Sequence, residues 1–127
     1  MRSYETAVSR AHGRGSTKNG FSHWWRQRIT SVLLVPLLAW LAGGLALQAG
    51  ADLESARAWV AFPLNATLLI VALAVLFYHA ALGVQVVIED YVHLEGLKVA
   101  SLMLLYLVCF ALVVAGSLAV VRIALGG

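Results

Sequence analysis

One histidine lies in an apolar stretch where an imidazole is unusual. His79 is the only histidine between Arg57 and Glu89, and this interval contains no Asp, Glu, Lys or Arg. The stretch is apolar enough to lie inside a membrane, where an ionisable side chain is costly unless a partner binds it. We therefore treat His79 as a candidate binding residue.

The residues that follow His79 give it a small neighbour and a polar helix end. In an α-helix, positions i, i+4, i+7 and i+11 share one narrow stripe, which here carries His79, Gly83, Val86 and Asp90. Gly83 removes side-chain bulk one turn from the imidazole, so a flat cofactor can lie against the backbone there. At about 1.5 Å per residue, His79 lies roughly 16 Å from Asp90 along the axis, about halfway into a ~30 Å apolar core.

Three kinds of chemistry suit a histidine inside a membrane. A neutral imidazole can ligate haem iron, make an interhelical hydrogen bond or relay protons. A haem with two imidazole ligands would need the second from another chain, because the other histidines lie outside the apolar stretches or at the membrane surface: His12, His23 and His93. The residue pattern leaves these three alternatives open.

Asp90 and Tyr91 stand where the same apolar stretch ends. A tyrosine hydroxyl can donate a hydrogen bond to a quinone carbonyl, and a nearby carboxylate can tune or deliver the proton. Tyrosine is also common in the aromatic belts at membrane surfaces, and aspartate is common at helix ends. Taken without His79, the pair favours this ordinary interfacial role.

The composition excludes an independent soluble domain. The 127 residues are 61% hydrophobic and 12% charged, with a mean hydropathy of +0.87, whereas soluble domains carry about 25% charged residues. The net charge of +3 does not indicate nucleic-acid binding, because six of the nine Lys and Arg residues lie in the first 28 positions. The single cysteine, Cys109, excludes an internal disulfide and a multi-cysteine metal site.

Three apolar stretches are long enough to cross a membrane as helices, each of which needs about 20 residues. We expect spans at about 29–50, 62–88 and 99–121, joined by short connections at 51–61 and 89–98. Pro36 is expected to kink the first span, because proline removes a backbone donor. Trp59 is expected to mark the interface at the far end of that span.

The first 22 residues are polar and basic. We interpret residues 1–22 as a cytoplasmic segment that docks on a soluble partner, and residues 23–127 as a three-helix membrane domain. The segment from His23 to Arg28 predicts an interfacial anchor, because indoles prefer the headgroup level and arginines bind anionic lipid. Since positive charge marks the cytoplasmic side, we expect the N-terminus in the cytoplasm and Arg28 and Asp90 at the same membrane face.

Together these motifs resemble the hydrophobic membrane anchor subunit of succinate dehydrogenase (respiratory complex II), of the small three-helix type. The resemblance covers about residues 20–127. It rests on residues 22–30 (SHWWRQRIT), on Pro36-Leu37, and on His79-x-x-x-Gly83 followed by residues 85–93 (QVVIEDYVH).

The resemblance implies an all-α membrane fold in which three transmembrane helices form half of a heterodimeric haem-binding bundle. It implies that His79 is one axial ligand of haem b, with the other ligand supplied by the cytochrome b556 anchor subunit. Asp90 and Tyr91 would lie at the ubiquinone site, the tyrosine bonding a quinone oxygen. Arg28 would lie near the haem propionates and the quinone pocket.

The resemblance also implies an enzyme subunit that has no succinate-oxidising site of its own. The flavin and the iron–sulphur clusters would belong to a flavoprotein subunit and an iron–sulphur subunit. The complex would lie in a bacterial cytoplasmic (inner) membrane, with the C-terminus of this chain in the periplasm and no nucleic acid as a partner. Two alternatives remain: an anchor of fumarate reductase, which runs the reaction in reverse, and a non-catalytic scaffold or assembly protein whose His79 only makes a hydrogen bond.

Overall fold

A computed structural model of the chain describes residues 17–126, so most of the basic segment expected at 1–22 lies outside the described residues. The described chain is helical, with no strand between residues 17 and 126. It forms α2 (Thr17–Leu47), α3 (Leu53–Ala61), α4 (Pro63–Tyr91) and α5 (Glu95–Ala124). The three long helices are apolar enough to cross a membrane, which confirms the all-α, three-span fold predicted from the sequence.

The helices extend past the apolar stretches that predicted them. α2 begins at Thr17, inside the segment interpreted as a polar and basic docking segment, and it continues through Pro36 to Leu47. α4 and α5 likewise run beyond the expected spans into the polar connection at 89–98. A helix can continue beyond the lipid core because its backbone hydrogen bonds do not depend on the surrounding solvent.

The connection expected at 51–61 contains a helix that the sequence reading missed. α3 begins after Asp52, whose carboxylate accepts a 2.8 Å hydrogen bond from the backbone N–H of Ser55. Hydrogen bonds from the side chain and the backbone of Ser55 lower the pKa of Asp52, because they stabilise the ionised carboxylate. At the other end, the side-chain amide of Asn65 donates a 2.8 Å hydrogen bond to the carbonyl of Trp59.

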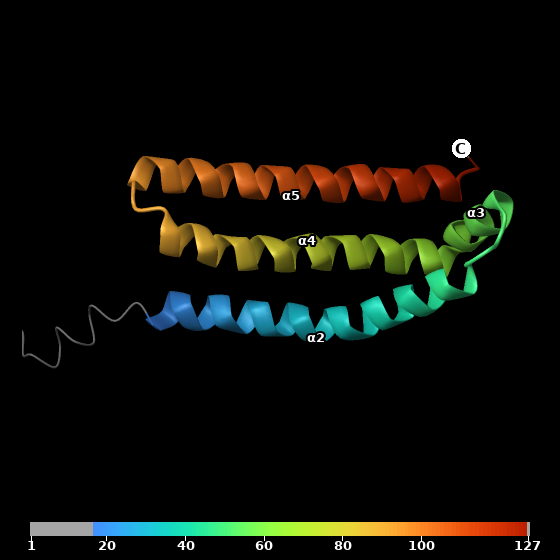
Figure 1. The fold of residues 1–127 in the computed structure, drawn as a ribbon, viewed down its shortest axis with the longest axis horizontal. Helices are drawn as coiled ribbons and strands as arrows, with labels where there is room; N and C mark the ends of the chain where they lie inside the picture. The colour runs from blue at the N-terminus through green and yellow to red at the C-terminus, as the bar shows by residue number, and fades with distance from the viewer. Residues whose placement is uncertain (1–16, 127) are drawn as a thin grey trace, which may run out of the picture.

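The three long helices form one layer with α4 in the middle (Figure 1). α2 and α5 each pack on α4 and not on each other, and α3 packs on α5 and α4. The start of α2, the end of α4 and the start of α5 lie at one end of the layer, while α3 and the C-terminus lie at the other. Arg28 and Asp90 therefore belong to the same half of the layer, as the charge pattern predicted.

Few side chains are covered within this layer. The buried apolar residues are Leu34, Ala72, Ala81, Leu82 and Val120, and many large apolar side chains on the three long helices are exposed. Lipid or another membrane chain must cover those faces, because exposing so much apolar surface to water is energetically unfavourable.

Trp59 joins α3 to the end of α2. Its ring stacks on Trp40 with the ring centroids 5.6 Å apart, and it lies directly against the backbone of Gly44. The interfacial role expected for Trp59 is thus accompanied by a packing role that needs a glycine opposite the indole.

We expect Gly44→Ala to destabilise the chain and Gly43→Ala not to do so. A Cβ at Gly44 would overlap ring carbons of Trp59, whereas a Cβ at Gly43 meets nothing within 4 Å. Overpacking of this kind costs about 1–3 kcal/mol, while alanine in an open helical position is favoured over glycine by about 0.5–1 kcal/mol. Thermal unfolding midpoints of the two variants in one detergent would test this. Equal midpoints would contradict the close packing.

Candidate functional site

His79 projects from α4 toward α2 and is half-buried. Its Nδ1 lies 2.8 Å from the hydroxyl oxygen of Thr30, and its Nε2 lies 3.4 Å from the side-chain nitrogen of Gln27. Thr30 is 7% exposed and is the one buried polar side chain among residues 20–126. Two polar side chains of α2 therefore hold both ring nitrogens at the α2–α4 interface.

Gln27 and Thr30 lie on the face of α2 that meets α4. The Thr30 hydroxyl lies 2.9 Å from the carbonyl oxygen of Arg26 and 3.0 Å from that of Gln27. Such a bond to the preceding turn is common for threonine in helices. The sequence reading placed Gln27 in an interfacial anchor and Thr30 at the start of the first span, and it missed the contact of both residues with His79. Their i, i+3 spacing at the start of an apolar helix is the signal that was available.

Gly83 lies one turn after His79 and faces the same side chain of α2. A Cβ at Gly83 would lie 3.7 Å from the side-chain nitrogen of Gln27, which is ordinary contact. The space that the sequence predicted beside Gly83 is therefore bordered by the Gln27 amide.

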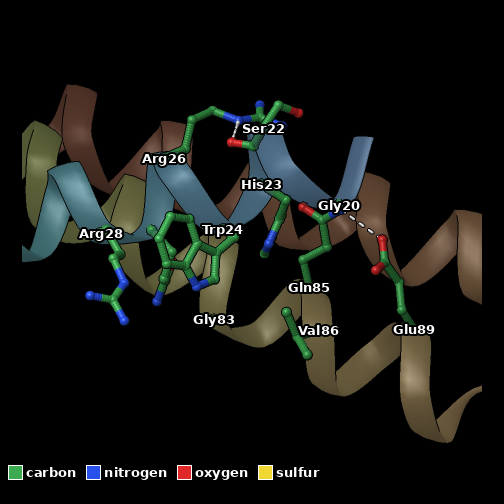
Figure 2. Close-up of a pocket in the computed structure, with 11 residues that line it drawn as sticks. Gly20, Ser22, His23, Trp24, Arg26, Arg28, Gly83, Gln85, Val86 and Glu89 are labelled. Carbon is green, nitrogen blue, oxygen red and sulfur yellow. Dashed lines mark hydrogen bonds between the residues drawn. The ribbon is translucent and has the colours of Figure 1, made fainter. Parts of the chain in front are cut away.

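A cavity of about 840 Å³ opens between the first half of α2 and the last part of α4 (Figure 2). Gln27 and Gly83, which both adjoin His79, are part of its wall. Arg28 and Trp24 stand at one end of the cavity and Glu89 at the other. The lining residues are Gly20, Ser22, His23, Trp24, Arg26, Gln27, Arg28, Gly83, Gln85, Val86 and Glu89.

The charges along this cavity favour an anionic group. Two arginines line it, Arg26 and Arg28, against one carboxylate, Glu89. The Arg28 guanidinium lies 4.5 Å from the ring centroid of Trp24, and Arg26 Nε donates a 3.2 Å hydrogen bond to the carbonyl of Ser22. A carboxylate-bearing molecule would thus meet two cations, each held by a neighbouring group of α2.

Glu89 is tied into a short hydrogen-bonded chain that joins α4 to α5. The side-chain amide of Gln85 donates a 2.7 Å hydrogen bond to the Glu89 carboxylate, and the Tyr106 hydroxyl donates a 2.6 Å hydrogen bond to the side-chain oxygen of Gln85. The carboxylate is therefore partly engaged, which leaves the arginines as the dominant charges of the cavity.

Two buried polar atoms beside the cavity have no hydrogen-bond partner within the described part of the chain. They are Nε2 of His23 and the side-chain oxygen of Gln27. Buried polar atoms almost always find a partner. These two are positions where the polar groups of a bound molecule would pair.

The residues present fit a haem. An imidazole bonded through one nitrogen offers the other to iron, Gly83 limits bulk one turn away, and two arginines suit the propionate carboxylates. Iron at Nε2 would require the Gln27 amide to move aside. Among residues 17–126 no cluster of three or more His, Cys, Asp or Glu could hold a bare metal ion.

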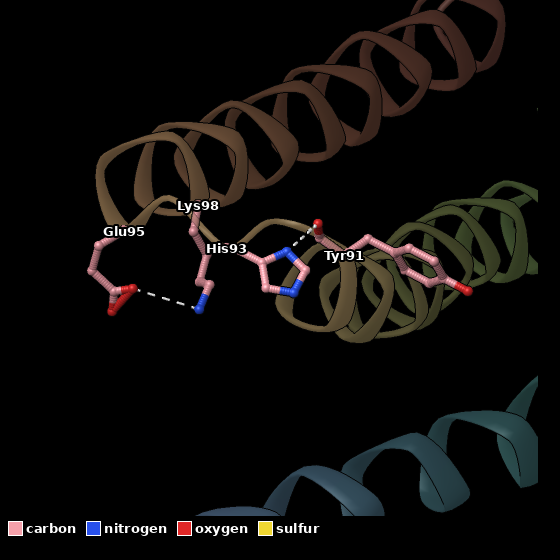
Figure 3. Close-up of polar contacts among 4 residues, drawn as sticks. All are labelled: Tyr91, His93, Glu95 and Lys98. Atoms are coloured by element: carbon pink, nitrogen blue, oxygen red, sulfur yellow. Dashed lines mark hydrogen bonds and ion pairs between the residues drawn. The ribbon is translucent and has the colours of Figure 1, made fainter.

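Asp90 and Tyr91 lie at the end of α4, outside the lining of this cavity. Both are exposed, and the Tyr91 side chain is 79% exposed. The Tyr91 carbonyl lies 3.1 Å from Nδ1 of His93, while the tyrosine ring points away from that imidazole (Figure 3). The described residues thus bring His79, Gly83 and Arg28 to one region and leave the Asp90-Tyr91 pair on the open surface nearby.

The next residues add charge to the same surface. Lys98 and Glu95 form an ion pair, with Nζ and Oε2 3.5 Å apart (Figure 3). The polar end of the layer is therefore built from the end of α4 and the start of α5, with Tyr91 and Asp90 accessible to a ligand or a partner chain.

Comparisons with known proteins agree on one group. Residues 2–120 match the family described as succinate dehydrogenase/fumarate reductase transmembrane subunit. A succinate dehydrogenase hydrophobic membrane anchor subunit of Rickettsia conorii is 30% identical over 113 residues, covering 88% of this chain and 90% of the relative. The corresponding subunit of Rickettsia bellii is 35% identical over 95 residues, covering 75% and 76%.

A relative from a third organism is similar to the chain. The succinate dehydrogenase membrane anchor subunit of Reclinomonas americana is 32% identical over 92 residues, covering 70% of this chain and 77% of the relative. No solved structure matches the chain.

Proposed function

The chain belongs to the succinate dehydrogenase/fumarate reductase transmembrane subunit family as a hydrophobic membrane anchor, and from this we propose that it supplies one axial ligand of haem b and part of a ubiquinone reduction site. His79 is the proposed iron ligand. Arg28 is proposed to meet the haem propionates, and Tyr91 and Asp90 the quinone.

The environment of His79 is the observation that carries the proposal. The imidazole lies at a helix–helix interface with Nδ1 bonded to Thr30 and Nε2 facing the Gln27 amide. The nearby cavity is lined by Gln27 and Gly83, which adjoin His79, and by two arginines, and it is bordered by two buried polar atoms without a partner among the described residues. When bound, the haem supplies one-electron redox chemistry, and the chain supplies position and electrostatics.

Tyr91 and Asp90 suit contact with a quinone because both are exposed at the end of α4, in the half of the layer that also contains Arg28. The phenol donates a hydrogen bond to a quinone carbonyl, and the carboxylate assists the proton uptake that accompanies reduction to the quinol. Their position at the membrane surface gives protons from water a short route to this site.

The uncovered faces of the layer support the proposed partners. A flat layer with few buried side chains is half of the proposed bundle, and the cytochrome b556 anchor subunit, with its own membrane histidine, would complete it. The iron–sulphur and flavoprotein subunits would dock on the cytoplasmic face of a bacterial inner membrane. The N-terminus would lie on that face and the C-terminus in the periplasm, since basic residues gather at the start of the chain.

Purification of the tagged chain in mild detergent tests this proposal. We expect a flavoprotein, an iron–sulphur protein and a second membrane chain to copurify, together with a low-spin haem spectrum and succinate–ubiquinone reductase activity. A chain that purifies without the first two partners would favour the scaffold alternative. Faster quinol-driven fumarate reduction than succinate oxidation would favour a fumarate reductase anchor, which belongs to the same family.

A further inference from the structure

The Thr30 hydroxyl is the group that bonds Nδ1 of His79. A hydroxyl carries one hydrogen and accepts through its lone pairs. The Thr30 hydroxyl has two backbone carbonyls within reach, those of Arg26 at 2.9 Å and Gln27 at 3.0 Å. A carbonyl oxygen can only accept, so the hydroxyl can donate its single hydrogen to either carbonyl while its oxygen still accepts a bond from His79. When Nε2 binds a metal, the proton of the neutral imidazole lies on Nδ1, and Nδ1–H then donates across the 2.8 Å contact to Thr30.

The other ring nitrogen of His79 faces the side-chain amide of Gln27. The side-chain nitrogen of Gln27 lies 3.4 Å from Nε2 of His79, and an amide NH₂ group can only donate. With the amide in this orientation Nε2 accepts, whereas the reversed amide would place the unpartnered side-chain oxygen of Gln27 against Nε2. The orientation in the structure suits the neutral tautomer that is protonated at Nδ1, which is the form that presents Nε2 to a metal.

We propose that Thr30 is the positioning residue that fixes the tautomer and the ring plane of His79, so that Nε2 is the nitrogen that binds iron. The inference rests on the proposed function, because it assumes that His79 ligates haem. Thr30 touches neither iron nor substrate and acts only through the imidazole. Its burial, at 7% exposure, keeps water from replacing the hydroxyl as the acceptor.

The hydrogen bond has an electronic consequence as well as a geometric one. An imidazole that donates its distal N–H is a more basic ligand, and a more basic ligand stabilises the ferric state over the ferrous state. Loss of the Thr30 hydroxyl should therefore raise the midpoint potential of the haem. It should also free the ring to rotate, which alters the electron paramagnetic resonance g-values of a low-spin haem.

Thr30→Val in the whole purified complex tests the inference, because valine keeps the shape and removes the hydroxyl. We expect a raised haem midpoint potential, shifted g-values and a loss of haem affinity of about 10–100-fold. Thr30→Ser should return all three readouts to the values of the parent complex. Thr30→Ala, which removes the same bond without adding bulk, gives the same measurement if the valine variant does not assemble.

Ser31→Ala is the matched control. The Ser31 hydroxyl donates a 2.8 Å hydrogen bond to the carbonyl of Gln27, so it resembles Thr30 in sequence position and backbone bond. It should leave the potential and the g-values unchanged. A shift in Ser31→Ala equal to that in Thr30→Val would show that any lost hydroxyl in this turn has the effect, and would overturn the proposal.

Failure of this inference differs from failure of the proposed function. If His79→Ala removes the low-spin haem while Thr30→Val and Thr30→Ala keep the potential, g-values and haem affinity of the parent, Thr30 is only a packing residue. If His79→Ala leaves the haem spectrum unchanged, the ligand assignment itself is wrong, and the proposed function fails together with the inference.

Discussion

Replacing His79 with alanine is expected to remove the low-spin, bis-imidazole haem signature of the purified complex. The substitution deletes one of the two proposed axial ligands, so the haem either leaves or becomes high-spin. Both ring nitrogens of His79 already face polar groups of α2, and Gln27 and Thr30 offer no nitrogen that could ligate iron in its place. Absorbance and low-temperature electron paramagnetic resonance spectra, with haem quantified per complex, give the measurement.

Two further variants make this test specific. His79→Gly should leave room for added imidazole, which is expected to restore the low-spin spectrum in part. His93→Ala removes an exposed histidine at the end of the same polar surface and should keep the spectrum of the parent. A parent-like spectrum in His79→Ala would refute ligation. The remaining reading would be an interhelical hydrogen bond to Thr30, whose loss costs about 0.6–2 kcal/mol of stability in a membrane.

The three spans were predictable because each depends on local composition alone. An apolar run of about 20 residues forms a helix in a membrane whatever its neighbours are, since every backbone group must be satisfied within the segment. The short helix α3 was missed because its signal is weak: nine residues without an apolar run, started by the Asp52 cap. Its position depends on the packing of Trp59 against Gly44 and Trp40, which no local pattern reveals.

The site was predictable on α4 and not on α2. The i, i+4 pair of His79 and Gly83 follows from helix geometry. The contacts of Gln27 and Thr30 with His79 depend on which faces of α2 and α4 pack together and on the relative shift of the two helices along their axes. Neither can be predicted from the sequence of one helix alone. Arg28 was expected near the site and does line the cavity, while Arg26 and Glu89 line it without having been predicted to do so.

The position of the Asp90-Tyr91 pair shows what a single chain leaves undetermined. Both residues end α4 on the exposed surface, next to the cavity region and not in its wall. A quinone site built there would need walls from other subunits, just as a second imidazole would need another membrane chain. The role proposed for the pair is therefore open to test only in the assembled complex.

Tyr91→Phe is expected to lower ubiquinone reduction by about 10²-fold or more while succinate oxidation itself continues. The substitution removes only the hydroxyl proposed to donate to a quinone carbonyl, and positioned proton donors contribute about 10²–10⁴-fold to such reactions. Because the Tyr91 side chain is 79% exposed and its hydroxyl has no buried partner among residues 17–126, phenylalanine should not disturb the fold. The measurement is the succinate–ubiquinone reductase rate of the purified complex.

A dye that accepts electrons before the quinone site provides the internal reference. Its reduction by succinate should keep the parent rate in Tyr91→Phe, because the succinate site is proposed to lie in another subunit. Tyr78→Phe changes a second tyrosine of α4, within the membrane span, and should leave both rates unchanged.

If Tyr91→Phe keeps the full ubiquinone rate, Tyr91 is an interfacial belt residue and the proposed quinone contact is wrong. If the rates with dye and with ubiquinone fall together, Tyr91→Phe has disturbed assembly, and Asp90→Asn becomes the deciding variant. A fall in Asp90→Asn that is confined to the ubiquinone rate supports a contact between this helix end and the quinone. Two unchanged rates in Asp90→Asn refute that contact.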